Sequence, residues 1–251
     1  MFKLINGRAK LINGRSDLLK YEKKVFSQNG EDGVTMRLIS LLYNGDNSNK
    51  YYVEFGTESG VECNTRILRE VYNWDGLLMD GSHENLEINL RKEYITKDNI
   101  TSLFEKYNVP SNINILSVDI DSNDFYILNQ ILKRYTCDII ICEYNSAHSP
   151  YEDKIVIYDE NLFWDRSNYF GASLLSMTKL CNMYGYTLIY CDTQGINCFF
   201  INNKVLEAKN LKFPYQNDIV KLYNPPGYGK NGHPKDRLNR LYYNFNQALM
   251  L

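Results

Sequence analysis

The chain has 251 residues, and 44% of them are hydrophobic, which is enough for one sizeable core with a small appendage at most. Its formal net charge of -2 leaves no basic surplus of the kind that binds nucleic acid. No window approaches the roughly 18 apolar residues of a membrane span, and the first residues lack the apolar stretch of a secretory signal. We therefore expect a soluble, cytoplasmic protein with no membrane span and no nucleic-acid partner.

The cysteines show neither CxxC spacing nor the spacing of a disulfide framework. The six are Cys63, Cys137, Cys142, Cys181, Cys191 and Cys198. We expect free and mostly buried thiols, as in a reducing cytoplasm.

The N-terminus contains a short repeat, Leu4–Arg8 and Leu11–Arg15, with a period of seven residues. Each copy includes a glycine, which costs a helix about 1 kcal/mol relative to alanine. We therefore predict that residues 1–24 form an arm, mobile or facing another copy in a homo-oligomer, rather than a solenoid.

Helical and strand-like segments alternate from residue 27 onward. In the first half, we predict a helix after the polar start 27–32, a strand at 51–55, a helix at 63–72, a strand at 76–79, a helix at 84–90, a weak third strand at 93–96 and a helix at 99–107 capped by Asp98. In the second half, we predict a strand at 113–118, a helix at 125–134, a strand at 138–142, a polar loop at 146–168, a helix at 172–184, strands at 187–190 and 197–201, and an aromatic-rich helix around 241–249.

This alternation predicts an α/β fold with a doubly wound, mostly parallel, seven-stranded sheet. The two closing strands have no helix between them, so they form a hairpin and the last strand is antiparallel. The predicted domain covers residues 25–204, and residues 205–251 form a C-terminal extension that could bind the acceptor. Ligands of such sheets bind outside the carboxyl ends of the strands.

Glycines and acidic residues follow the first strand, in the run Val53-Glu-Phe-Gly-Thr-Glu-Ser-Gly60. Gly56 and Gly60 let the backbone turn tightly and approach a ligand. The run resembles the first motif of class I methyltransferases, which bind S-adenosylmethionine (SAM). The resemblance implies that Glu54, Gly56, Glu58 and Gly60 contact this cofactor.

Asp80, followed by Gly81, ends the second strand. An acidic residue there can accept hydrogen bonds from both hydroxyls of an adenosine ribose. A dinucleotide-binding enzyme would carry G-x-G-x-x-G in the turn after the first strand, and that turn lacks it. The absence of that motif from the turn therefore favours SAM over a dinucleotide, with Asp80 and Gly81 beside the adenosine.

Further segments resemble the FkbM-like group of methyltransferases, over roughly residues 25–202. They are Phe26-Ser-Gln-Asn-Gly-Glu-Asp-Gly33, Tyr52-Val-Glu-Phe-Gly56, Leu116-Ser-Val-Asp-Ile-Asp-Ser-Asn-Asp124, Ile141-Cys-Glu-Tyr-Asn145 and Tyr169-Phe-Gly-Ala-Ser173. The resemblance implies O-methylation of a sugar hydroxyl in capsular or surface polysaccharide synthesis. It further implies a nucleotide-activated acceptor, such as a heptose.

Three other functions remain open. One is N- or O-methylation of another small metabolite. Another is an inactive methyltransferase fold that serves as a binding module, although its acidic and glycine positions are all present. A nucleic-acid methyltransferase would place an N-P-P-[YF] motif after the fourth strand, whereas Asn224-Pro-Pro-Gly227 lies in the tail.

Carboxylates follow the fourth and fifth strands, whose ends lie side by side in a parallel sheet. Asp119, Glu143 and Asn145 resemble the oxygen ligands with which several O-methyltransferases hold a divalent cation. Oxygen ligands suit Mg2+ or Mn2+, and such an ion lowers the pKa of a substrate hydroxyl. The alternative is metal-free general base catalysis, for which Asp121 and His148 are the candidates.

The tail is basic after its Pro-Gly-rich turn. Lys230, His233 and Arg237 are candidates to bind the diphosphate of a nucleotide-sugar, and a solvated basic loop is the alternative. Trp164, Tyr169 and Phe170 are candidates for a platform under a sugar or nucleobase, with core packing as the alternative.

Overall fold

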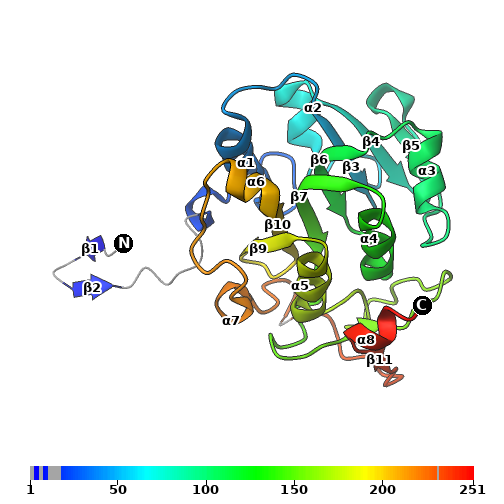
Figure 1. Cartoon of the computed structure of the whole chain (residues 1–251). Coiled ribbons are helices and arrows are strands. Elements are labelled where there is room, and N and C mark those ends of the chain that lie inside the picture. The colour runs from blue at the N-terminus through cyan, green and yellow to red at the C-terminus, as the bar shows by residue number, and fades with distance from the viewer. Residues whose placement is uncertain (1–2, 6–7, 11–17, 231) are drawn as a thin grey trace.

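The computed structural model describes residues 3–5, 8–10, 18–230 and 232–251. The strands of its main sheet are β3 (Tyr51–Phe55), β4 (Asp75–Asp80), β5 (Leu90–Lys92), β6 (Asn112–Val118), β7 (Thr136–Glu143), β9 (Tyr186–Cys191) and β10 (Asn197–Asn202). They are ordered β5-β4-β3-β6-β7-β10-β9, as Figure 1 shows. The first five are parallel, and β10 runs antiparallel to both of its neighbours. This is the class I methyltransferase fold, and the predicted fold class is confirmed.

Helices cover both faces of the sheet (Figure 1). One face carries α1 (Glu31–Tyr43), α2 (Arg66–Tyr72) and α6 (Asn203–Ala208), and the other carries α3 (Ile100–Lys106), α4 (Asp124–Leu132) and α5 (Leu174–Met183). Successive side chains of a strand point to opposite faces. Val53 and Phe55 of β3 therefore enter one core while Tyr52 enters the other, and all three are buried. Burial on both faces explains why the parallel strands read as continuous apolar runs.

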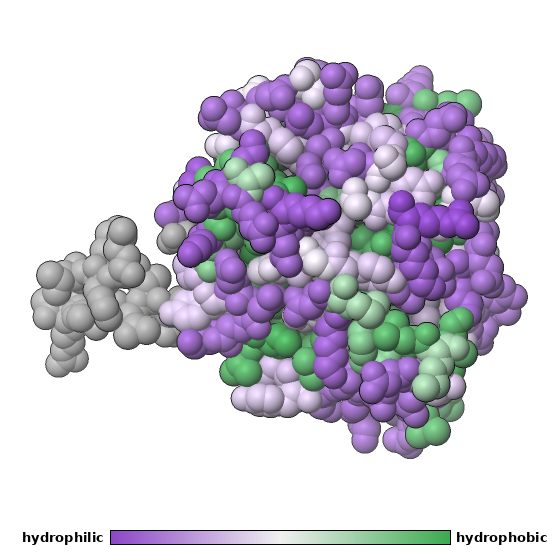
Figure 2. Space-filling model, in the orientation of Figure 1, coloured by the Kyte–Doolittle hydropathy of each residue, from purple (hydrophilic) through white to green (hydrophobic). Residues whose placement is uncertain are grey.

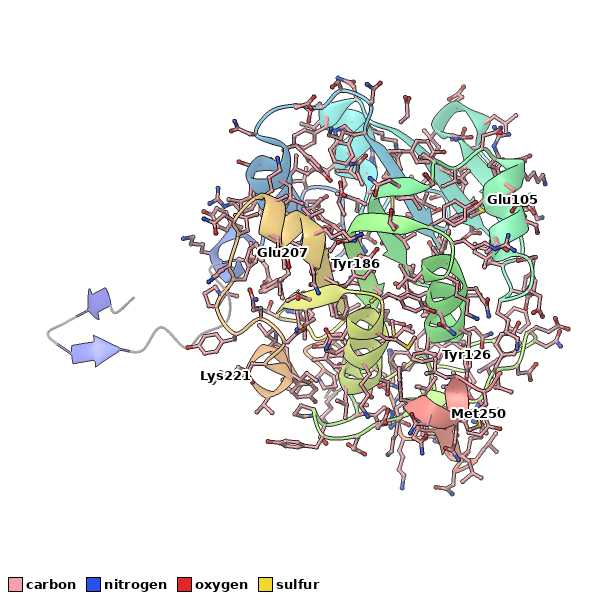
Figure 3. All side chains as sticks on the ribbon, viewed as in Figure 1. Glu105, Tyr126, Tyr186, Glu207, Lys221 and Met250 are labelled. Carbon is pink, nitrogen blue, oxygen red and sulfur yellow. The ribbon has the colours of Figure 1, made fainter. Side chains whose placement is uncertain are left out.

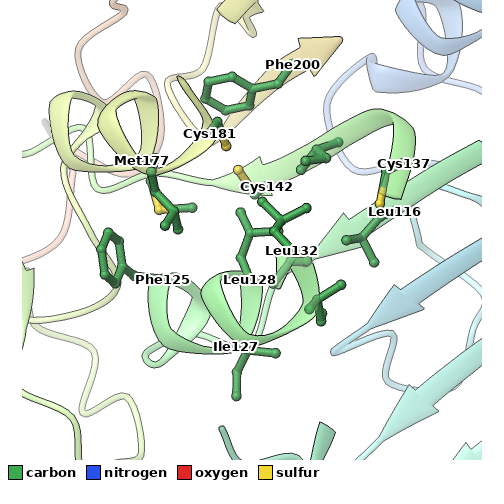
Figure 4. Close-up of a cluster of buried hydrophobic side chains, with 14 of the residues drawn as sticks. Leu116, Phe125, Ile127, Leu128, Leu132, Cys137, Cys142, Met177, Cys181 and Phe200 are labelled. Carbon is green, nitrogen blue, oxygen red and sulfur yellow. The ribbon is translucent and has the colours of Figure 1, made fainter. Parts of the chain in front are cut away.

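The close-up in Figure 4 shows the core between α4, α5 and the sheet. Phe125 and Leu128 from α4 and Met177 from α5 lie near Cys142 of β7, and each is wholly buried. Each large apolar side chain buried in this way stabilises the fold by about 1.5–3 kcal/mol. All six cysteines are buried and free, as the sequence predicts.

The third strand differs from its prediction. It is β5 and begins at Leu90, which is fully buried and pairs with Leu78, whereas residues 93–96 form no strand. Glu93 instead accepts hydrogen bonds from the side chains of Lys106 and Tyr107 in the following helical segment. The predicted helix at 84–90 is reduced to η2 (Leu86–Ile88), a single 3-10 turn.

The start of α3 also differs. Its N-cap is Asn99 rather than Asp98. The Asn99 side chain accepts a hydrogen bond from the backbone N–H of Thr96 at 2.8 Å, so it stabilises the turn before the helix.

The C-terminal extension packs onto the same body. The predicted aromatic helix is a short strand, β11 (Tyr242–Tyr243), followed by the single-turn α8 (Phe245–Ala248). β11 pairs with β8 (Ile155–Val156) from the long loop, and α7 (Ile219–Leu222) precedes both β11 and α8. Tyr126, labelled on α4 in Figure 3, donates a hydrogen bond to the Val156 carbonyl at 2.9 Å and so ties this pair to the domain.

At the N-terminus, β1 (Lys3–Ile5) and β2 (Arg8–Lys10) pair as an antiparallel hairpin, while the repeat copy Leu11–Arg15 lies outside the described residues. Leu18 is buried in the core just before the 3-10 turn η1 (Leu19–Tyr21). Hydrophilic residues cover most of the face shown in Figure 2. None of the helices in the described ranges has both the length and the apolar character to cross a membrane.

Candidate functional site

The loop after β3 requires glycine at its first position. Gly56 has a φ of +66°, and a Cβ built there would lie 1.7 Å from the carbonyl oxygen of Asp119 at the end of β6. The Gly56 N–H also donates to the Met79 carbonyl at 3.1 Å. The ends of β3, β4 and β6 therefore meet at Gly56, which leaves no room for a side chain. Gly60 has a φ of +73°, and a Cβ there would meet Ile88, so it serves loop packing.

Glu54, the acidic residue at the end of β3, holds the start of α2. Its carboxylate accepts the backbone N–H groups of Asn64 and Thr65, each at 2.8 Å, and the Thr65 hydroxyl at 2.5 Å. Burial raises the pKa of Glu54, against the effect of these hydrogen bonds. Its carboxylate faces the pocket described below, but its bonds fix the loop around that pocket.

Asp80 joins two loops at the end of β4. Its Oδ2 accepts the Glu58 N–H at 2.9 Å, and its Oδ1 accepts from the backbone and side chains of Ser82 and His83. Burial acts to raise the pKa of Asp80, but the hydrogen bonds from Ser82 and His83 outweigh it and lower the pKa. Oδ2 accepts one of these bonds, so a lone pair remains on an ionised carboxylate.

Two pockets open at the carboxyl ends of the strands. We name them the acidic pocket, of about 480 Å3, and the adjoining pocket, of about 460 Å3. Both are lined by Gly56, Asp80, Asp121 and Trp164. Of the other predicted site residues, Glu54, Glu58, Asp119, Glu143 and His233 line the acidic pocket, and Gly81 lines the adjoining one. The adjoining pocket also has apolar walls, including Met79, Ile95 and Ile120.

A cluster of carboxylates lies at the ends of β6 and β7. Single oxygens of Asp119, Asp121 and Glu143 lie within 4.8 Å of one another. Burial raises the pKa values of Asp119 and Glu143, and mutual repulsion among the carboxylates raises them further. Glu143 Oε2 is buried without a hydrogen-bond partner. The cluster is an oxygen-only ligand set that lacks positive charge.

Asp124, at the start of α4, belongs to the same neighbourhood, although its role escaped the strand-end argument. Its Oδ1 accepts the Ile120 N–H at 2.8 Å, and its Oδ2 is buried without a partner. Burial raises the pKa of Asp124 to about 7. A Cβ on Gly171 would lie 3.9 Å from Asp124 Oδ2 and 4.0 Å from Glu143 Oε2, so the loop before α5 passes beside both carboxylates. Asp124 is the last residue of the segment 116–124 that resembles FkbM-like enzymes, and this resemblance was the one sequence feature that could have indicated its place in the site.

Asn145 and His148, both predicted beyond the fifth strand, line neither pocket. The Asn145 side-chain amide donates to the carbonyls of Asn168 and Phe170, each at 2.9 Å, so it holds the loop before α5. Asp121 takes the place in the cluster that the sequence assigned to Asn145. His148 is 5% exposed, and its ring lies 4.8 Å from that of Tyr242. Burial lowers the pKa of His148 to about 4.

Aromatic rings form another part of the acidic pocket. The His233 ring lies 4.5 Å from Trp164, 4.8 Å from Tyr228 and 5.6 Å from Phe170, measured between ring centroids. All four line the pocket, and we name them the aromatic wall. Tyr228 and His233 come from the C-terminal extension, and sequence reasoning found no role for Tyr228.

The remaining predicted substrate residues lie elsewhere. Lys230 and Arg237 are exposed and line neither pocket. Tyr169 donates its hydroxyl hydrogen bond to the Leu241 carbonyl at 3.0 Å and supports the tail rather than a pocket.

A loop before α1 brings Gln28 into the acidic pocket. Asp32 Oδ2 accepts the backbone N–H groups of Val25, Phe26 and Ser27 at 2.7–2.9 Å, and Glu31 accepts those of Asn29 and Gly30 at 2.9 Å. Asp32 is wholly buried, and Glu31 is 1% exposed. These buried acids shape the loop that presents the exposed Gln28 side chain, a residue to which the sequence argument gave no role.

No protein-family model matches the sequence, and no curated protein matches it. Among solved structures, the CMeT domain of the citrinin polyketide synthase matches 71% of this chain and 54% of its own, at 9% identity and a TM-score of 0.36. An O-methyltransferase family protein from Burkholderia thailandensis matches 74% of this chain and 66% of its own, at 9% identity and a TM-score of 0.38. This chain thus spans only part of the length of either structure.

Proposed function

We propose that the protein is a SAM-dependent methyltransferase. The observation that carries the proposal is the junction of Gly56, Asp119 and Asp80. At the carboxyl ends of the parallel strands, Gly56 packs too closely against Asp119 for any side chain to fit. Beside it, the Asp80 carboxylate keeps a lone pair that is free to accept a further hydrogen bond. Two connected pockets begin at this junction, which suits a cofactor with two different ends.

The residues present fit SAM. Asp80 would accept a ribose hydroxyl, and the adenine would lie beside Gly81 in the adjoining pocket, against its apolar walls. The sulfonium is positively charged, so the carboxylates of the acidic pocket, Glu58 among them, would attract it. Gln28 would supply an amide donor for the carboxylate of the methionine end.

The transfer is an in-line displacement, because the sulfonium already activates the methyl group. The protein therefore has to position the acceptor and remove its proton. Asp119, Asp121 and Glu143 would hold Mg2+ or Mn2+, which fits their oxygen donors and the unpartnered Glu143 Oε2. When bound, such an ion lowers the pKa of a hydroxyl. In a metal-free reaction Asp121, exposed in the pocket, is the better placed of the two predicted bases.

For the acceptor, we propose a sugar hydroxyl, as the resemblance to FkbM-like enzymes implies. Synthesis of a capsular or surface polysaccharide is the corresponding process. The carboxylates and the aromatic wall in one pocket suit a ring that carries hydroxyl groups.

The test is a calorimetric titration of the protein with S-adenosylhomocysteine, with and without Mg2+ or Mn2+. We expect micromolar binding. Asp119→Ala and Glu143→Ala should each abolish turnover and leave cofactor binding nearly intact. Absence of binding under every condition would refute the methyltransferase proposal and favour a binding module, whereas loss of binding in either variant would move that residue into the cofactor site.

A further inference from the structure

The ionisable side chains around the two pockets are almost all acidic. Acidic side chains lining the acidic pocket are Glu54, Glu58, Glu62, Asp80, Asp119, Asp121 and Glu143. Across the described part of the chain, neither pocket is lined by a lysine or an arginine. His233 lines the acidic pocket, and burial lowers its pKa, which favours the neutral ring. A phosphate bound there would meet several carboxylates and, among the described residues, no lysine or arginine side chain.

The basic residues of the tail do not bring positive charge to the acidic pocket. Arg240 forms ion pairs with Asp165 at 2.5 Å and Asp236 at 3.1 Å, and its guanidinium covers the Tyr169 ring at 4.0 Å. Phosphate recognition normally uses free guanidinium or ammonium groups in charge-assisted bonds. The Arg240 guanidinium is already committed to the structure of the tail.

The segment that carries the aromatic wall is held in place. Asn224 is 1% exposed, and its side-chain amide donates to the carbonyls of Cys191 and Asp192 at 3.1 and 2.8 Å. The Gly227 N–H donates to the Gln194 carbonyl at 2.7 Å, one residue before Tyr228. The position of Tyr228 is therefore fixed by the β9–β10 turn.

Tyr228 links the aromatic wall to the carboxylates. Its side chain lines the acidic pocket together with Asp119 and Glu143. Phe170 is adjacent to Gly171, which lies beside Glu143 and Asp124. An acceptor against the wall would thus present its polar groups to the acidic cluster.

From this arrangement we propose that the acceptor is an uncharged sugar ring without a phosphate, either free or glycosidically linked, and that the aromatic wall binds it. The ring packs against Tyr228, Trp164 and His233, and its hydroxyls donate hydrogen bonds to the carboxylates. Lys230 and Arg237 then have no role in binding, contrary to the interpretation of the tail as a diphosphate site. This inference rests on the proposed methyltransferase function.

The experiment first saturates the full-length protein with S-adenosylhomocysteine, in parallel samples with and without Mg2+, because a bound ion would offer a phosphate the positive charge that the side chains lack. Saturation-transfer NMR then measures binding of the methyl glycosides of glucose, mannose, galactose and fucose, and of uridine diphosphate and uridine diphosphate glucose. We expect at least one glycoside to bind. Uridine diphosphate should give no signal, and uridine diphosphate glucose should give none beyond that of its glucose ring.

Variants separate the wall from the basic residues. Tyr228→Ala should weaken glycoside binding about fivefold, a factor typical of one aromatic contact, and leave the affinity for S-adenosylhomocysteine unchanged. The matched control is Tyr151→Ala, because Tyr151 is 74% exposed and lines neither pocket. The combined variant Lys230→Ala, Lys235→Ala, Arg237→Ala should bind the glycoside as the wild type does.

The outcomes distinguish the two proposals. If S-adenosylhomocysteine fails to bind, the methyltransferase function fails, and the acceptor class fails with it. If it binds but no glycoside does, or if uridine diphosphate gives a binding signal, the acceptor proposal alone is wrong; loss of the uridine diphosphate signal in the combined variant would assign that binding to the basic tail. Equal losses in Tyr228→Ala and Tyr151→Ala would also overturn it.

Discussion

Replacing Asp124 with asparagine tests the electrostatics of the acidic cluster directly. Asp124 is 1% exposed, its Oδ2 has no partner, and burial raises its pKa to about 7. Asparagine keeps the carbonyl that accepts the Ile120 N–H and removes the charge. The variant therefore isolates the cost of ionising a buried carboxyl.

The sign and size of the effect follow from linkage. Because the pKa is higher in the folded than in the unfolded chain, the folded state binds the proton more tightly. The wild type is thus penalised progressively as pH rises from the ordinary value of 3.8 toward 7. A difference of about three pKa units corresponds to at most about 4 kcal/mol. Asp124→Asn should be more stable than the wild type at pH 8, by up to that amount, and similar to it at pH 4.

The assay is urea unfolding of both proteins between pH 4 and 8, without divalent cations. Asp75→Asn is the matched control, because Asp75 is exposed at the start of β4. A stability difference for Asp124→Asn that does not change with pH would refute the reasoning. So would an equal, pH-dependent gain in the control.

Three other substitutions test the loops around the pockets. Gly56→Ala should destabilise the protein by more than about 3 kcal/mol, whereas Gly45→Ala, also at positive φ but in open space, should cost about 1 kcal/mol in thermal unfolding. Glu54→Gln should cost about 2 kcal/mol in urea unfolding, because only one end of the amide accepts hydrogen bonds and either Asn64 or Thr65 then loses its acceptor; an unchanged midpoint would argue against that role. Gln28→Ala should weaken S-adenosylhomocysteine binding about tenfold in calorimetry with no change in the unfolding midpoint, and an unchanged affinity would exclude Gln28 from the cofactor site.

The fold was predictable because its central strands are buried on both faces, and β3, β6 and β7 each form an apolar run that ends in acidic residues. The edge strand β5 was predicted three residues too late, at 93–96 instead of Leu90–Lys92, because an edge strand lacks the burial on both faces that marks the central strands. Only Leu90 of its three residues is buried, and it is followed by Arg91 and Lys92, so no periodicity marks it.

The sequence predicted only those site residues whose position follows directly from the end of a strand. The sequence brought Asp119 and Glu143 together correctly, because the ends of parallel neighbours meet at one edge of a sheet. It could not tell that Asn145 turns into the loop before α5 while Asp121 turns toward the cluster, since side-chain direction after a strand depends on the loop. Nor could it place Tyr228, because the tail reaches the pocket through tertiary contacts alone.

The same electrostatics connect stability with the proposed chemistry. Asp124 is buried beside Asp119 and Glu143, which are partly buried, and the charged forms of these carboxylates repel one another. Folding alone gives no reason to keep such a cluster, because carboxylates that repel one another in the folded protein lower its stability when they are ionised. A sulfonium, a divalent cation or a transferred proton would each relieve the repulsion at this place. Under the proposed function, the bound cofactor would bring such a charge as its sulfonium, and transfer of the methyl group to a hydroxyl would release a proton beside the cluster.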